Sequence, residues 1–550
     1  MKTKVKIAFL GGVDEFGENL TCYYDGTDGF MVDFGAMFPD YYHHGVTYFY
    51  PDYKFITDNY QKFKVLFVTH GHEDHIGGIV NIVDRIPLRI IASEYTIALI
   101  KRKLMFSKVK FYPVLEVAEN LSEYSVGKFK IKFIENDHSI IDSYSLKITY
   151  DNDYFIFHSS DFKIDKKSEK TNNFLDALKE NFKKTDIALV DSTNATVDYD
   201  INLSETNVKN SLEDIIEKAR HNVFVTMFSS NIERIINLIN IVEKFKKPLV
   251  FLGRSLDKYT KLAEDINIRI SKKNIISSME YNDFLEKDEN FNAVFLIAGS
   301  QGELTSALTN IAYNQYKGVF VNEGDIVVYS SKAIPGNEKD ILKVKNQLLK
   351  KGTTLITLNN DDNIHASGHS NADGLREIIK ILKPDNLIPV HGTLMQQNAL
   401  KKIALQENVK NIMIPSLGDI FSYDGEKLNH EKTIELSKKF LDITGFDDMD
   451  YSLIKERDKL KLGICAISLI IDKRDYFLLK NPKVELRGFV DDNHLNLIIE
   501  KAIGEIYRII DDMDLSSEEY FREVLILKMK RFFRKRYNIS PYFILLTDYV

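Results

Sequence analysis

The sequence contains no tryptophan and only two cysteines in 550 residues. Cys22 and Cys465 lie far apart and neither belongs to a CxxC pair, so the pattern argues against a disulfide framework or a thiolate zinc site and favours two packed thiols. No apolar run is long enough to cross a bilayer, and the short run at residues 7–10 has no signal-peptide cleavage site after it. We therefore expect a cytoplasmic protein without membrane contact.

Neither sign of charge is in great excess, because 73 Lys and Arg oppose 80 Asp and Glu for a net charge of −7. An acidic total argues against a protein that coats nucleic acid indiscriminately, although a local basic groove is compatible with it. Hydrophobic residues make up 44% and charged residues 28%, which is the composition of a globular protein. At about 150 residues per domain, the length predicts roughly three domains.

The first third of the chain contains short apolar runs separated by turn residues, at positions 5–10, 29–33 and 65–69. Such runs are typical of buried strands in a layered α/β domain. A similar strand-like pattern, now with histidines, returns at residues 354–392. We therefore expect the first domain to be completed late in the chain, after an insertion.

The intervening part has a different pattern, in which amphipathic helices alternate with apolar strands. This βαβ pattern predicts a second α/β unit inserted into the first. Its predicted helices are residues 212–220 and 232–246, and its predicted strands are 222–226, 248–252 and 293–298. A polar, helix-like stretch at 430–439 predicts a linker. The predicted segments are 1–200 (α/β domain, first part), 201–352 (inserted α/β domain), 353–428 (completion of the first domain), 429–457 (linker) and 458–550 (small C-terminal α/β domain).

Residues 70–75 (HGHEDH) follow a predicted strand and concentrate three imidazoles and an aspartate in six positions. In an extended turn, His70 and His72 can point one way while Asp74 and His75 reach a neighbouring ion. These nitrogen and oxygen ligands suit Zn²⁺ or Mn²⁺. A polar surface loop is the alternative, but such clustering is unusual in a chain with 13 histidines. The segment therefore predicts a site for two metal ions.

Further ligands are available where other apolar strands end. His138 follows the run 129–134, Asp161 follows 154–158 and His391 follows 387–390. Taken singly, each residue is more often a structural polar group. Together, in chain order after HGHEDH, they complete a dinuclear site.

This order of motifs resembles that of the metallo-β-lactamase superfamily. The long insertion, together with residues 191–194 (DSTN) and 365–369 (HASGH), resembles its nucleic-acid-processing β-CASP branch. Within that branch the chain closely resembles the ribonuclease J family over almost its whole length. The further segments that carry the resemblance are 11–19 (GGVDEFGEN), 299–303 (GSQGE), 334–338 (IPGNE), 389–392 (PVHG) and 487–490 (RGFV).

The resemblance implies a metallo-β-lactamase αββα sandwich, an inserted β-CASP α/β domain and a small C-terminal α/β domain that supports dimerisation. It implies a metal-dependent ribonuclease with 5′→3′ exonuclease and endonuclease activity, acting on single-stranded RNA in RNA degradation and maturation. Each subunit would hold two divalent ions, Zn²⁺ in the first place and Mn²⁺ or Mg²⁺ as alternatives. The partner subunit would be a second copy or a paralogue.

The resemblance also assigns roles to individual residues. Two ions would activate a water for attack on phosphorus, with Asp74 and His75 central to catalysis, and the product would keep a 5′-phosphate. His369 is the candidate general acid, oriented by Asp191. One ion would be held by His70, His72, His138 and Asp161, and the other by Asp74, His75, Asp161 and His391, so that Asp161 bridges them.

Two segments are candidates for substrate binding. His365 would contact the scissile phosphate, and the amides of Ala366, Ser367 and Gly368 next to His369 can approach a phosphate closely because glycine tolerates such backbone geometry; a histidine pair that binds only water is the alternative. Ser229, Ser230 and Asn231 begin a helix-like segment, where free amides favour an anion such as a 5′-monophosphate, and simple helix capping is the alternative.

The chain departs from the family pattern at two positions. Glu233 stands where the family usually has histidine, and a carboxylate there would repel a 5′-monophosphate. Ile141 stands where proline is common, which would change loop rigidity more than chemistry. The basic run 528–537 with its interleaved aromatics either binds RNA backbone or forms an amphipathic helix with packed aromatics, and we favour the helix.

Other functions stay open at this point. The chain could be a mainly noncatalytic partner of an active ribonuclease J paralogue, but its complete ligand set argues against this. It could be a small-ester hydrolase such as a lactonase or thioesterase, but the insertion and HASGH argue against that reading. DNA as the substrate is a narrower alternative, because a sensor of the 2′-hydroxyl cannot be identified in the sequence.

Overall fold

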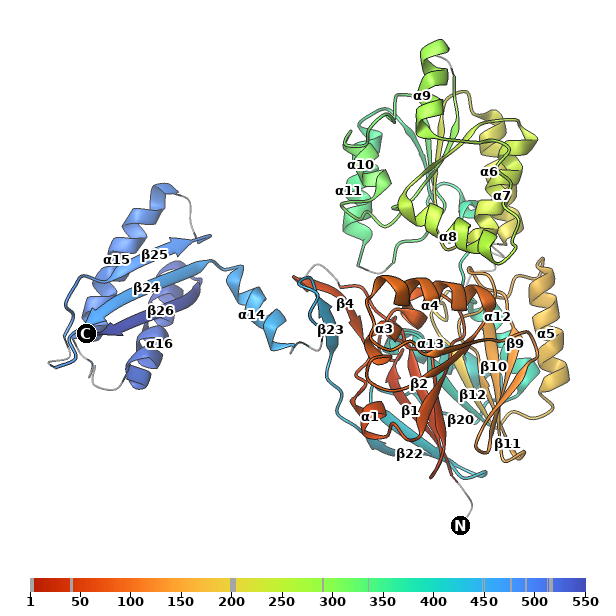
Figure 1. The fold of residues 1–550 in the computed structure, drawn as a ribbon, viewed down its shortest axis with the longest axis horizontal. Coiled ribbons are helices and arrows are strands. Elements are labelled where there is room, and N and C mark those ends of the chain that lie inside the picture. The colour runs from red at the N-terminus through yellow and green to blue at the C-terminus, as the bar shows by residue number, and fades with distance from the viewer. Residues whose placement is uncertain are drawn as a thin grey trace. The chain divides into compact units, whose positions relative to one another are not determined.

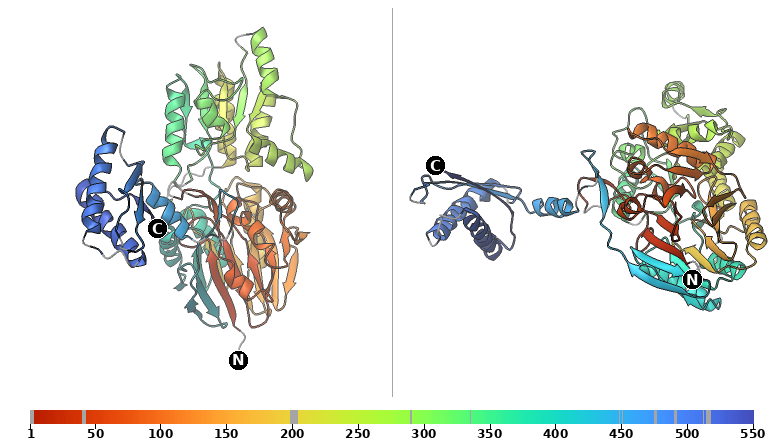
Figure 2. Two further views of the ribbon diagram at one scale, coloured as in Figure 1. Left: turned by 60° about the vertical axis from the view of Figure 1, so that its left-hand side comes forward. Right: turned by 60° about the horizontal axis from the view of Figure 1, so that its bottom comes forward.

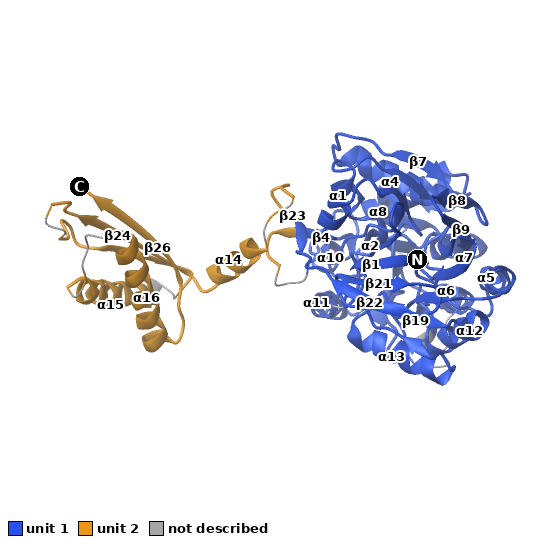
Figure 3. Cartoon of the chain, turned by 90° about the horizontal axis from the view of Figure 1, so that it is seen from below, with its two compact units in different colours: residues 1–40, 47–441 blue, residues 41–46, 442–550 orange. Residues whose placement is uncertain are grey.

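A computed structural model describes the chain except for residues 1–3, 40–42, 198–203, 289–290, 335, 448, 450, 475–476, 490–491, 512 and 514–517. Position 335 of the 334–338 motif and position 490 of the 487–490 motif thus lie outside the described residues. The chain divides into two compact units, residues 1–40 with 47–441 and residues 41–46 with 442–550 (Figure 3). In the described part, no helix is both long and apolar enough to cross a membrane.

The larger unit contains two sheets that face each other across a shared core. One sheet has the order β22-β21-β1-β2-β3-β5-β6-β7 and the other β20-β19-β12-β11-β10-β9-β8. The first comprises β1 (Val5–Gly11), β2 (Leu20–Tyr24), β3 (Gly29–Val32), β5 (Phe63–Phe67), β6 (Arg89–Ala92), β7 (Val114–Val117), β21 (Asp419–Tyr423) and β22 (Leu428–Thr433). The second comprises β8 (Glu123–Val126), β9 (Phe129–Glu135), β10 (Tyr144–Tyr150), β11 (Tyr154–His158), β12 (Ile187–Asp191), β19 (Asn386–Val390) and β20 (Asn411–Ile412). A short sheet pairs β4 (Val46–Tyr50) with β23 (Lys439–Asp442).

Helices cover the outer faces of both sheets. In β12 successive residues point to opposite faces, so Ile187 and Leu189 join the core between the sheets while Ala188 and Val190 pack under helices. The helices over the first sheet are α1 (Lys54–Asp58), α2 (Glu73–Ile76), α3 (Ile79–Ile82) and α4 (Glu94–Phe106). Those over the second are α5 (Glu169–Asn181), α12 (Ala372–Leu382) and α13 (Leu394–Gln406). The four layers confirm the αββα sandwich (Figure 1).

The inserted α/β unit follows β12 and has a parallel sheet of order β15-β14-β16-β13-β17-β18. Its strands are β13 (Val223–Thr226), β14 (Leu249–Leu252), β15 (Ile275–Ile276), β16 (Val294–Ile297), β17 (Ile326–Tyr329) and β18 (Thr354–Ile356). Helices α6 (Glu205–Lys218), α7 (Ile232–Lys244) and α8 (Arg254–Asp265) cover one face, and α9 (Ser278–Lys287), α10 (Ala307–Ala312) and α11 (Glu338–Leu349) cover the other (Figures 1 and 2). A 3₁₀ turn, η1 (Asp362–Ile364), precedes the HASGH loop.

Helix α6 begins earlier than the apolar periodicity at 212–220 indicates. Ser204 provides the reason, because its side chain accepts a hydrogen bond from the amide of Asn207 and so caps the helix at Glu205. The predicted helix at 430–439 is wrong. Residues 428–433 form β22, which pairs with β21 at the edge of the first sheet, and a half-exposed edge strand is as polar as a surface helix.

The smaller unit contains helix α14 (Ser452–Leu460) and a sheet of order β25-β24-β26. Its other elements are β24 (Ile464–Ile471), β25 (Lys483–Arg487), α15 (Asp492–Ile510), α16 (Glu518–Tyr537) and β26 (Tyr542–Tyr549). The basic run 528–537 is the last part of α16, where Met529 and Phe533 are fully buried in the core of this unit. The favoured interpretation, an amphipathic helix with packed aromatics, is confirmed.

Candidate metal centre

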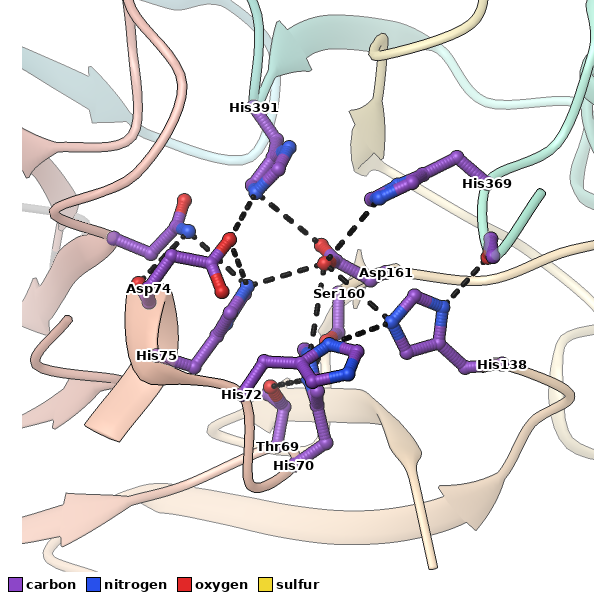
Figure 4. A network of polar contacts seen from close by, with 12 residues as sticks. Thr69, His70, His72, Asp74, His75, His138, Ser160, Asp161, His369 and His391 are labelled. Atoms are coloured by element: carbon purple, nitrogen blue, oxygen red, sulfur yellow. Dashed lines mark hydrogen bonds and ion pairs between the residues drawn. The ribbon is translucent and has the colours of Figure 1, made fainter. Parts of the chain in front are cut away.

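The backbone at HGHEDH changes from extended to helical, and this change divides its ligands into two sets. The chain leaves β5 in an extended conformation up to His72, which is the N-cap of α2. Asp74 and His75 lie in the first turn of α2. His70 and His72 thus enter the site from the segment before α2, and Asp74 and His75 enter beside them from the helix (Figure 4).

The remaining ligands come from the ends of strands in the second sheet. His138 follows β9, Asp161 follows β11 and His391 follows β19. Ser160 and His391 have positive φ angles of 54° and 53°, which non-glycine residues rarely adopt and which often mark functional sites. The structure therefore brings together all seven residues that the sequence nominated as ligands.

These seven residues form two groups of four that share one carboxylate. Within each group the potential ligand atoms lie within 4.8 Å of one another. Asp161 belongs to both groups, since its Oδ2 lies 3.6 Å from His70 Nε2 and 3.2 Å from His75 Nε2. The groups are His70, His72, His138 and Asp161, and Asp74, His75, Asp161 and His391.

The donor atoms in the site fit divalent cations. His72 Nδ1 lies 3.2 Å from His70 Nε2 and 3.1 Å from His138 Nε2, so three ring nitrogens converge on one place. The Oδ1 atom of Asp161 is buried and has no hydrogen-bond partner among the described residues. Converging nitrogens and a buried carboxylate oxygen without a hydrogen bond suit a bound cation.

The electrostatics of the site agree with this fit. Burial lowers the pKa of His70, His72 and His138, to about 4 for His72, so these rings are neutral and keep lone pairs for a metal. Burial also opposes protonation of His391, but the nearby Asp161 raises its pKa to about 9. The buried carboxylates thus attract positive charge.

Hydrogen bonds orient several ligand rings with Nε2 toward the site. His75 Nδ1 donates to Asp33 Oδ2 at 2.8 Å, and His391 Nδ1 donates to Thr193 Oγ1 at 2.7 Å, which in turn donates to Asp191 Oδ1 at 2.6 Å. His138 Nδ1 donates to the carbonyl of Gly368 at 2.6 Å. Such outer contacts fix the tautomer and the ring direction of a metal ligand.

Asp33, Thr193 and the Gly368 carbonyl were not identified as orienting groups from the sequence. Gly368 permits its contact because a Cβ there would lie 2.7 Å from His138 Cε1. Asp33 follows β3 and has a φ of 61°, which marks a strained position in the structure, but an aspartate after a strand gives no specific signal in the sequence.

The candidate acid pair lies beside the second ligand group. His369 Nδ1 donates to Asp191 Oδ2 at 2.8 Å, and His369 Nε2 lies 4.0 Å from Asp161 Oδ2. Burial lowers the pKa of His369, but the charges of Asp191 and Asp161, together with the hydrogen bond to Asp191, raise it above the ordinary value. Asn194 holds the loop by donating to Ser367 Oγ at 2.8 Å and to the His369 carbonyl at 3.0 Å.

Residues 229–231 have separate structural contacts. Asn231 is the N-cap of α7 and accepts from the amide of Arg234, as the capping alternative predicts. Ser229 Oγ contacts Ser255 Oγ at 2.9 Å, while Ser230 Oγ lies 3.4 Å from His72 Nε2 and so adjoins the first ligand group. Their role toward a phosphate stays a prediction.

The sequence did not indicate any role for Arg234 in the site. It lies in the first turn of α7, is 1% exposed and forms an ion pair with Glu205 at 2.5 Å. It also contacts His365 and the carbonyl of Ala366. An arginine in an amphipathic helix normally faces solvent, so no sequence signal distinguishes this one.

Three family models match successive parts of the chain. The metallo-β-lactamase superfamily matches residues 61–153, the ribonuclease J β-CASP domain matches 220–348, and the Zn-dependent metallo-hydrolase RNA specificity domain matches 359–415. A solved structure of a protein of unknown function from Enterococcus faecalis has the same fold, with a TM-score of 0.56 and 17% identity over 76% of this chain and all of that one. Fold and site together define a metallo-hydrolase of the metallo-β-lactamase superfamily with a β-CASP insertion.

Curated relatives identify the branch. Ribonuclease J of Sinorhizobium meliloti is 30% identical over 86% of this chain and 84% of its own length. Ribonuclease J of Corynebacterium glutamicum is 29% identical over 98% and 75%, and ribonuclease J 2 of Staphylococcus saprophyticus is 28% identical over 92% and 91%. The chain belongs to the ribonuclease J family of metal-dependent ribonucleases.

Proposed function

We propose that this protein hydrolyses single-stranded RNA in the cytoplasm, by 5′→3′ exonucleolytic and endonucleolytic cleavage, and leaves 5′-phosphates. The observation that carries the proposal is the pair of ligand groups joined by Asp161. Such a pair is suited to phosphodiester hydrolysis, in which the attacking and leaving oxygens both carry charge. The inserted domain and the HASGH loop beside this pair support a polymeric substrate over a small ester.

We assign the metal ligands as the two groups define them, with Zn²⁺ as the first candidate and Mn²⁺ or Mg²⁺ as alternatives. Histidine-rich sites with carboxylates suit Zn²⁺ better than Mg²⁺, which prefers oxygen ligands. When bound, two divalent ions stabilise negative charge on the phosphodiester and make water a stronger nucleophile at neutral pH.

The protein's own residues handle the proton and the substrate. His369 donates a proton from Nε2 to the leaving 3′-oxygen, while Asp191 holds its Nδ1 at 2.8 Å and stabilises the charged ring. The backbone amides of Ser367 and Gly368, next to this ring in the sequence, are the proposed contacts for a phosphate. Because Asn194 fixes Ser367 and the His369 carbonyl, the loop keeps one geometry as RNA enters.

Residues 229–231 are our proposed contact for the 5′-phosphate end. Ser230 has the strongest support, because it adjoins His72. Glu233 lies in the first turn of α7 and is half-buried, so it lowers the local affinity for a 5′-monophosphate. We also propose that the residue 458–550 domain supports assembly with a second copy or a paralogue.

Cleavage of one RNA labelled separately at each end tests the function. The RNA carries either a 5′-monophosphate or a 5′-triphosphate, and the reactions contain Zn²⁺, Mn²⁺ or a chelator. Metal-dependent release of mononucleotides from the monophosphate RNA supports the exonucleolytic mode, and internal cuts support the endonucleolytic mode. Asp74→Ala and His75→Ala should abolish both while RNA binding stays measurable. Absence of cleavage with every metal would contradict the proposal and favour a noncatalytic partner subunit.

A further inference from the structure

His365 and His369 belong to one loop but have opposite electrostatic surroundings. His369 pairs with the carboxylate of Asp191, whereas His365 pairs with the guanidinium of Arg234. Arg234 Nη1 lies 2.9 Å from His365 Nδ1, and both residues are buried. A buried cation next to a histidine opposes protonation of the ring. His365 is therefore poorly suited to carry a proton, and its role differs from that of His369.

Arg234 is fixed on all sides. Nε donates to Glu205 Oε2 at 3.0 Å, and Nη2 donates to Glu205 Oε1 at 2.5 Å and to the Ala366 carbonyl at 3.1 Å. Nη1 donates to the Ser330 carbonyl at 2.8 Å. The bidentate pair with Glu205 offsets the cost of burying the charge, and the planar guanidinium then has one orientation.

This orientation determines which nitrogen of His365 carries the proton. A guanidinium has only donors, so Nδ1 must accept at 2.9 Å. The Ser330 carbonyl also lies 3.3 Å from Nδ1, but a proton there would face the Arg234 N–H at the shorter distance. The proton of the neutral ring therefore resides on Nε2.

The same surroundings keep the ring neutral. Burial and then the positive charge of Arg234 lower the pKa of His365 to about 3. Among the described residues, His365 Nε2 has no hydrogen-bond partner. This atom is also not completely buried. It is therefore a free donor that a ligand can reach.

We propose that Arg234 is a positioning residue that locks His365 as its neutral Nε2–H tautomer, a hydrogen-bond donor of constant strength for a nonbridging phosphate oxygen. The phosphate contact rests on the proposed function, whereas the tautomer follows from the contacts alone. The two histidines of this loop thus have different roles. His369 transfers a proton, and His365 binds the phosphate at any physiological pH without titrating.

NMR of the full-length protein with ¹⁵N-labelled histidine tests directly which ring nitrogen of His365 carries the proton. Imidazole ¹⁵N shifts are measured at pH 5, 7 and 9, and the His365 signals are assigned by their loss in His365→Asn. We expect an unprotonated Nδ1 and a protonated Nε2 at all three values. A protonated Nδ1, or titration of His365 within this range, overturns the proposal whatever the protein does to RNA.

Two variants test whether Arg234 determines the tautomer of His365. Arg234→Lys keeps the charge but loses the fork of donors, and Glu205→Gln/Arg234→Gln removes both charges together so that neither is left buried and unpaired. In both we expect the Nδ1–H tautomer to become detectable, because no planar guanidinium then holds an N–H at a fixed place against Nδ1. A His365 that stays wholly Nε2–H in the folded variants would show that Arg234 is not the cause.

RNA cleavage provides the second measurement. We expect Arg234→Lys to slow cleavage roughly 10-fold, as for other residues that orient a functional side chain, while Arg376→Lys on the surface of α12 matches the wild type. Equal rates for Arg234→Lys and wild type would overturn the positioning role. A protein with the expected tautomer and no cleavage at all would contradict the proposed function but not the lock.

Discussion

Replacing Asp191 by asparagine tests the proton donor most sharply. Asp191 Oδ2 accepts from His369 Nδ1, and Oδ1 accepts from the Thr193 amide and hydroxyl at 2.8 and 2.6 Å. In Asp191→Asn the oxygen can still face Thr193, which turns the new NH₂ group toward His369. Two donors would then meet, so Nδ1 must lose its proton and the ring can no longer hold a stabilised positive charge.

The expected loss follows from the value of a general acid. Such a group typically contributes 10²- to 10⁴-fold, which corresponds to about 3–5 kcal/mol of transition-state stabilisation. The pH dependence should change as well. Because Asp191 raises the pKa of His369 against the effect of burial, the wild type keeps the acid form to higher pH. In Asp191→Asn this pKa falls, and the decline of activity at alkaline pH should begin at lower pH.

The assay compares two leaving groups under single-turnover conditions. Labelled RNA releases a 3′-oxygen that requires a proton, whereas a nitrophenyl nucleotide ester releases a stable phenolate that does not. We expect Asp191→Asn to lose its activity on RNA and keep most of it on the ester. Asp186→Asn, directly before the same strand, is the matched control, since Asp186 accepts hydrogen bonds from the Tyr423 hydroxyl and the Phe155 amide and its loss should affect both substrates alike. Equal losses on both substrates in Asp191→Asn would refute the proton-donor role.

Three further predictions concern the metal centre, the smaller unit and the thiols. Asp33→Asn should weaken metal retention roughly 10- to 100-fold in competition with a chelator, because His75 loses its carboxylate partner; Asp28→Asn, at a partly exposed position, should leave retention unchanged. Phe533→Ala should destabilise the smaller unit by about 3–5 kcal/mol in urea unfolding, and an unchanged midpoint would contradict its place in that core. Burial raises the pKa of Cys465 to about 12 and raises that of Cys22 further, so neither thiol should react with a disulfide reagent at pH 8 before unfolding.

The metal ligands could be predicted from the sequence because their signals are local. His138, Asp161 and His391 each follow an apolar strand, and strand ends that share one edge of a layered sheet bring their side chains together. The inserted domain was recognisable for a similar reason, since its helices and strands alternate at regular intervals. These features depend on neighbouring residues and therefore appear in a single sequence.

The orienting contacts could not be predicted because they join distant segments. Asp33 contacts His75 across 42 positions, and Arg234 contacts His365 across 131. Each looks like an ordinary charged residue in its own neighbourhood. The strand at 428–433 escaped prediction for another reason, as its outer position at the sheet edge allows a polar composition that also suits a helix.

The loop 365–369 is anchored at its two ends to different parts of the larger unit. Arg234 of the inserted domain holds its first residue, while Asp191 and Asn194 of the sandwich hold its last. A displacement of the inserted domain would therefore separate His365, the proposed phosphate-binding residue, from His369, the proposed proton donor.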